Sequence, residues 1–152
     1  MENIFLFTGE NRYLLEQEKC RWIKEFTSKH GEQNLTRHDA RSVSLPILLD
    51  EVSFPPFIGA HRLVFVAGIP KCSKEELHDI AAAMHPQVLV LFVESNPDKR
   101  LGTVKELLAQ AQVKTFSSLT TTQLSRWITQ ELTSNNASIA PAAQAHFCLL
   151  YT

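Results

Sequence analysis

The chain has no excess of charge of either sign. Its 152 residues include 15 Lys and Arg and 16 Asp and Glu, which gives a formal net charge of -1. The basic residues are scattered along the sequence, whereas tight binding to nucleic acid requires several cations that neutralise neighbouring phosphates. We therefore do not expect this chain to bind DNA or RNA tightly through its own surface.

Cysteine is scarce, and long apolar runs are missing. Cys20, Cys72 and Cys148 are far apart, odd in number and without CxxC or CxxH spacing, so they suggest neither a disulfide framework nor a zinc site. No apolar run is long enough to span a membrane, and the first residues lack a charged leader followed by an apolar stretch. These absences predict a soluble protein of the reducing cytoplasm with no membrane partner.

The motifs of nucleotide chemistry are also missing. A P-loop needs GxxxxGK[ST] after the first strand, but residues 8–14 offer one glycine, no suitably placed lysine, and Glu10, whose carboxylate would repel a phosphate. The apolar run at 63–67 does not end in an acidic residue for magnesium, no GxGxxG follows any strand, and the six histidines show no HxH or HExxH pattern. We expect no catalytic residue, no cofactor and no metal site in this chain.

Short apolar runs are what the sequence has in their place. Continuous apolarity at residues 4–7, 63–67, 88–93 and, more weakly, 113–116 predicts strands that are buried on both faces of a parallel sheet. A more polar strand is predicted at 34–38, at an edge of the sheet.

Amphipathic stretches alternate with these runs. Apolar residues recur at helical spacing in 10–29, 45–52, 77–84 and 101–111, and Asn96-Pro97-Asp98 is a predicted start signal for the last of these helices. The alternation of strand and helix predicts a doubly wound α/β sheet.

The character of the chain changes after residue 116. Thr120 and Gln123 have the spacing of a capping box before the apolar stripe at 124–132, and no strand follows. Residues 134–136 are predicted to be a linker, and 139–151 one more helix with Pro141 near its first turn.

An apolar connector precedes the strand at 63–67. Residues 53–59 read Ser-Phe-Pro-Pro-Phe-Ile-Gly, where a polar loop is the usual expectation. The two prolines fix their own φ and restrict the backbone around Phe57. The connector is either a preformed apolar contact for a partner protein, or a cover in which Phe54, Phe57 and Ile58 fold back over the core beside Leu63.

The motifs together resemble the delta subunit family of the bacterial DNA polymerase III clamp loader. The similarity is carried by the strand at 4–7 with Gly9-Glu10 and Tyr13-Leu14, by the segment 56–64, and by three later elements in the same order: 88–93, Asp98-Lys99-Arg100, and Leu124 with Trp127-Ile128. The resemblance implies a RecA-like, AAA+-like domain at 1–134 without a functional P-loop, followed at 135–152 by the start of an incomplete helical lid domain.

The resemblance also implies a function. Delta subunits bind the sliding clamp and open the ring for loading onto primed DNA during replication, without hydrolysing ATP, as part of a DNA-directed DNA polymerase (nucleotidyltransferase) holoenzyme. The expected partners are therefore the clamp, the other loader subunits and, through the complex, primed DNA. The family's clamp contact falls by position on Pro56 and Phe57, flanked by Phe54, Pro55 and Ile58, and Pro56 stands where leucine is usual.

Two other functions remain compatible with the residues. The chain could be a nucleotide-binding α/β enzyme with an atypical phosphate loop, or a structural subunit that uses the connector for assembly with a sibling subunit.

Overall fold

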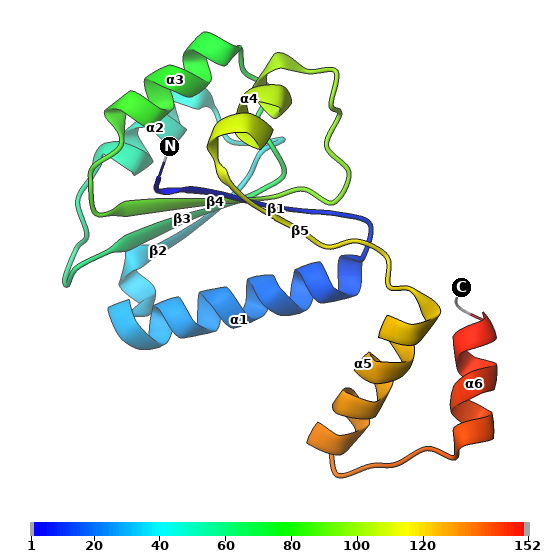
Figure 1. Cartoon of the computed structure of the whole chain (residues 1–152). Coiled ribbons are helices and arrows are strands. Elements are labelled where there is room, and N and C mark those ends of the chain that lie inside the picture. The colour runs from blue at the N-terminus through cyan, green and yellow to red at the C-terminus, as the bar shows by residue number, and fades with distance from the viewer. Residues whose placement is uncertain (1, 151–152) are drawn as a thin grey trace. The chain divides into compact units, whose positions relative to one another are not determined.

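The computed structural model describes residues 2–150. Within them, five strands form one parallel sheet in the order β2-β3-β4-β1-β5 (Figure 1). The strands are β1 (Ile4–Thr8), β2 (Leu35–Asp39), β3 (Arg62–Ala67), β4 (Val88–Val93) and β5 (Gln112–Thr115). The predicted α/β class, the parallel sheet and the edge position of β2 are confirmed.

Helices cover both faces of this sheet (Figure 1). The long helix α1 (Arg12–His30) packs on one face, and α2 (Leu45–Ser53), α3 (Lys74–Ala83) and α4 (Gly102–Gln110) pack on the other. Each face has its own buried cluster, because successive residues of a strand point to opposite sides. The face under α1 buries Phe7, Leu15, Phe26, Leu35, Leu63 and Leu91. The opposite face buries Ile4, Leu6, Leu48, Val52, Val64, Val66, Leu77, Ile80, Val88, Val90, Phe92 and Leu107.

The helix predicted at 101–111 is present as α4, which begins at Gly102. The signal at Asn96-Pro97-Asp98 lies several residues before that start and does not cap the helix. The Asp98 carboxylate instead accepts a hydrogen bond from the backbone N–H of Arg100, at 3.0 Å, and so caps a local turn.

The chain divides into two compact units that meet between Phe116 and Ser117. The second unit contains α5 (Thr121–Ser134) and α6 (Pro141–Leu150), and the predicted capping box of Thr120 and Gln123 is present at the start of α5. The two helices are joined by the Gln144 side chain, which donates to the backbone oxygen of Ser125 at 2.7 Å. This division precedes α5, and the domain boundary at 134 that the family resemblance implies stays a prediction. Tyr151, the predicted end of the last helix, lies outside the described residues.

Residues 2–150 contain no helix with the length and apolarity needed to cross a membrane.

Candidate functional site

The loop after β1 is folded against the rest of the first unit. The Gly9 N–H donates to the Ser95 oxygen at 3.1 Å, and the Asn11 N–H donates to the Phe116 oxygen at 3.0 Å. Asn11 also caps α1, since its side chain accepts from the Leu14 N–H at 3.1 Å. Backbone N–H groups at this position are the usual phosphate donors of such folds. Here these three point to oxygens of the protein itself.

Gly9 shows why the loop can close in this way. Its φ is +133°, and a Cβ added there would overlap the carbonyl oxygen of Phe116 and stand 2.6 Å from its backbone nitrogen. The glycine therefore permits close contact with the chain after β5. A glycine needed only for the approach of a phosphate would leave open space beside it.

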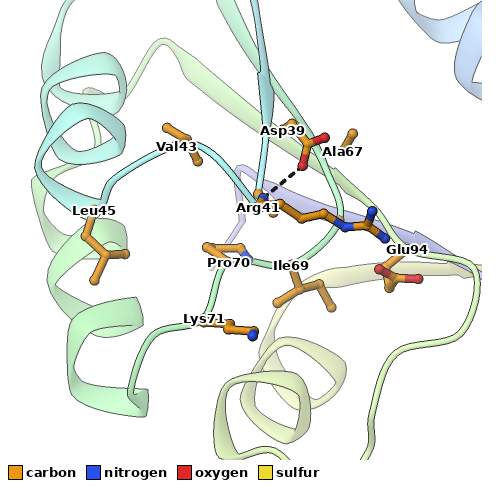
Figure 2. Close-up of a pocket in the computed structure, with 11 residues that line it drawn as sticks. Asp39, Arg41, Val43, Leu45, Ala67, Ile69, Pro70, Lys71 and Glu94 are labelled. Carbon is orange, nitrogen blue, oxygen red and sulfur yellow. Dashed lines mark hydrogen bonds between the residues drawn. The ribbon is translucent and has the colours of Figure 1, made fainter.

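A cavity of about 620 Å³ lies at the carboxyl ends of β2, β3 and β4 (Figure 2). Its charged lining is mixed, with Asp39 and Glu94 opposed by Arg41 and Lys71. Asp39 turns back on its own loop, where it accepts from the Arg41 N–H at 2.8 Å. No group of three or more His, Cys, Asp or Glu within residues 2–150 is placed to hold a metal ion. Gly68 stands where an ATPase would carry its acidic residue after β3, so the cavity lacks the constellation for phosphoryl transfer.

The apolar connector lies at the amino ends of the strands, opposite the end that holds the cavity. It begins after α2 ends at Ser53 and leads into β3 at Arg62. In a parallel sheet, the loops that precede the strands lie at one end of the sheet, and the loops that follow the strands lie at the other end. The connector is therefore remote from the carboxyl ends of the strands, where α/β enzymes bind their ligands.

The predicted site residues are mostly exposed on this connector. The exposed fractions are 79% for Phe57, 63% for Ile58 and 59% for Phe54. Pro55 is exposed and Pro56 is half-buried. The hypothesis that these apolar side chains fold back over the core is wrong, because all three are exposed and none belongs to the buried cluster that contains Leu63.

A shallow groove of about 560 Å³ accompanies these side chains. It is lined by Gln33, Phe54, Pro55, Pro56, Phe57 and Arg62. Single exposed apolar residues are common on protein surfaces, but three large ones within five residues, beside a groove, are typical of a protein-binding surface.

Asn34 anchors the backbone of the connector through hydrogen bonds from its side chain, a role that the sequence did not predict. It ends the short 3-10 helix η1 (Glu32–Asn34), and its side chain is completely buried. Its Oδ1 accepts from the Phe57 N–H at 2.8 Å, and its Nδ2 donates to the oxygens of Ile58 and His30. The sequence predicts only that Asn34 begins an edge strand. The one signal of a special role was its position, a polar residue directly before the apolar Leu35.

Two further contacts frame the end of the connector. Arg62 forms an ion pair with Glu51 of α2, and the His61 ring packs edge-on against His30, with ring centroids 5.2 Å apart. Burial lowers the pKa of His30, and the neighbouring His61 and Lys29 lower it further. The neutral imidazole is therefore favoured at this contact.

Comparison with known proteins gives the family. The family model described as "DNA polymerase III, delta subunit" matches residues 5–117. Among solved structures, the Bacillus subtilis DNA clamp loader delta protein (YqeN) is similar in fold, with a TM-score of 0.68 and 19% sequence identity. The match covers 97% of this chain and 48% of that one, so the chain spans about half the length of this relative. Comparison with curated protein sequences gave no match. Because the family model covers more than half of the sequence, the chain belongs to the DNA polymerase III delta subunit family.

Proposed function

We propose that this chain binds the sliding clamp through the connector and opens the ring for loading onto primed DNA. The observation that carries the proposal is the exposed apolar cluster of Phe54, Phe57 and Ile58, in a member of the delta subunit family. The loop after β1, with its N–H groups bonded inside the protein, supports a role without ATP hydrolysis.

Phe57 is the proposed anchor of the contact. Because 79% of this residue is exposed, nearly its whole apolar surface is still available for burial by a partner. Full burial of a phenylalanine side chain contributes about 1.5 to 3 kcal/mol, and a few such residues dominate most interfaces. Pro55 and Pro56 restrict the backbone before docking, so less conformational entropy is lost when the partner binds.

Ring opening follows from differential affinity. A protein shifts an equilibrium between two states of its partner only if it binds one state more tightly than the other. We propose that the connector fits an opened form of the clamp interface better than the closed form. In this scheme the other loader subunits control access to the connector, primed DNA is reached through the complex, and the complex works in the cytoplasm within the polymerase holoenzyme.

The test is capture of the purified clamp by the full-length protein. Phe57→Ala should weaken capture at least tenfold while the circular dichroism spectrum is unchanged, as the loss of a buried anchor predicts. Ile47→Ala is a matched control, because Ile47 is 50% exposed but lies near the start of α2, outside the connector. Equal capture by wild type and Phe57→Ala would refute the proposal.

A second candidate function uses the same exposed cluster. The connector could dock on a sibling subunit during assembly of the loader, since an exposed apolar surface serves either partner. In that case Phe57→Ala would impair assembly of the complex, measured by gel filtration, and clamp capture by the isolated subunit would persist.

A further inference from the structure

The backbone of the connector has little support of its own. Within residues 2–150, the segment 55–61 takes part in no backbone-to-backbone hydrogen bond. The neighbouring bonds belong to the end of α2, where the Phe54 N–H donates to Asp50, and to the start of β3, where the Arg62 N–H donates to Gln87. A loop of this kind samples several conformations unless a side chain holds it.

Asn34 supplies that support. A side-chain amide has two N–H donors and one carbonyl acceptor, and in Asn34 all of these groups are used. The Phe57 N–H and the Ile58 oxygen belong to neighbouring residues whose side chains are exposed. One buried residue therefore fixes the backbone of the two most exposed large apolar side chains of the connector.

We propose that Asn34 is a positioning residue for the clamp contact, a role that rests on the proposed function. It acts through Phe57 and Ile58, which it holds in an outward orientation before the clamp arrives. The prolines restrict the chain before this point, and Gly59, with φ at +96°, permits the turn after it. Asn34 joins these two restricted segments into one ordered loop, so the clamp does not have to order it on binding.

The presence of asparagine at position 34 favours a role in positioning the connector over a role in filling the core. The first strand residue after it, Leu35, already fills the apolar space under α1. An apolar side chain at position 34 would leave the N–H of Phe57 and the oxygen of Ile58 near the surface, where water can replace the lost bonds. The fold should then persist while the loop loses its fixed shape.

The experiment is a double-mutant cycle in the full-length protein, read out as affinity for the purified clamp. Asn34→Ala should weaken clamp binding about tenfold, as expected when roughly one residue's backbone must be ordered on binding. In the Phe57→Ala background the same change should have little further effect, because the anchor that Asn34 positions is already gone. Full additivity of the two changes, or an unchanged affinity for Asn34→Ala, would overturn the proposal.

A control separates positioning from loss of stability. Thr103 is also buried, and it lies at the start of α4, away from the connector. Its hydroxyl donates to the backbone oxygen of Cys72. Thr103→Val should lower the melting temperature and leave clamp affinity unchanged. Asn34→Leu, which keeps the branched shape and the number of side-chain heavy atoms, replaces Asn34→Ala in the cycle if the alanine variant does not fold.

Amide hydrogen exchange provides a readout that does not depend on the clamp. In the Asn34 variants, the Phe57 N–H should exchange at least tenfold faster than in wild type, while the N–H groups of β3 stay protected. Unchanged exchange at Phe57 would overturn the positioning role even if the affinity fell. If Phe57→Ala leaves clamp capture intact, the proposed function fails, and the exchange rate still decides whether Asn34 orders the loop.

Discussion

Gly9 and Gly59 offer a direct test of how the loop after β1 is closed. Both have positive φ, so alanine strains the backbone at either position. At Gly59 an added Cβ meets nothing within 4 Å, and we expect a loss of about 1 to 2 kcal/mol. At Gly9 the Cβ overlaps Phe116, so the chain after β5 must also move.

That movement has a calculable cost. It breaks the hydrogen bond from the Asn11 N–H to the Phe116 oxygen and the bond of 2.7 Å from the Phe116 N–H to the Thr8 oxygen. At about 1 kcal/mol for each bond, added to about 1 to 3 kcal/mol of backbone strain, Gly9→Ala should destabilise the first unit by about 3 to 5 kcal/mol.

The assay is urea denaturation followed by tryptophan fluorescence. A Trp127→Phe background leaves Trp22 as the reporter of the first unit, where its ring packs on Phe5 and Phe7 with centroids 4.7 and 5.3 Å away. The Gly9→Ala variant should unfold at a clearly lower urea concentration than Gly59→Ala. Equal losses in the two variants would refute the conclusion that Phe116 closes the loop.

Three further predictions concern charge and ligand binding. Since the folded pKa of His30 lies below its ordinary value of 6.5, the unfolded chain binds more protons, and stability should fall as the pH drops through 6.5. Urea titrations at several pH values would show this loss, and it should shrink in His30→Gln. The hydrogen bond from Arg21, with added attraction from Lys114, lowers the pKa of Glu18 to about 2. The contribution of the Glu18 carboxylate to stability is therefore present above pH 4.5 and lost as the pH falls from 4.5 to 2. Glu18→Gln should remove that part of the acid sensitivity, as urea titrations at these pH values would show. Calorimetric titration with Mg-ATP should show no saturable micromolar binding, and such binding would revive the nucleotide-enzyme hypothesis.

The strands were predictable because a parallel sheet imposes a simple pattern. A strand covered on both faces needs an apolar residue at nearly every position, and the runs around Leu63 and Val90 have this property. The edge strand β2 was predictable for the complementary reason, since it is less completely covered than the inner strands and admits the exposed polar residues Arg37 and Asp39.

The turn capped by Asp98 and the role of Asn34 were not predictable in the same way. Asp98 is as suitable for capping a turn as for capping a helix, and local sequence does not decide between them. Asn34 bonds to residues 23 and 24 positions away, and only the packing of α1, β2 and the connector brings them together. The exposure of Phe57 is also a tertiary property, because the apolar composition of the connector fits a buried cover equally well.

The place of the connector in the sheet has a mechanical consequence. A partner that pulls on Phe57 applies force to the N-terminal end of β3, which lies inside the sheet and pairs along its length with both β2 and β4. Force directed along a strand loads its ladder bonds together, whereas force across an edge strand would peel them apart one by one. In the proposed function, a pull on the connector is therefore carried by a strand that is paired on both sides, and its own domain stays folded.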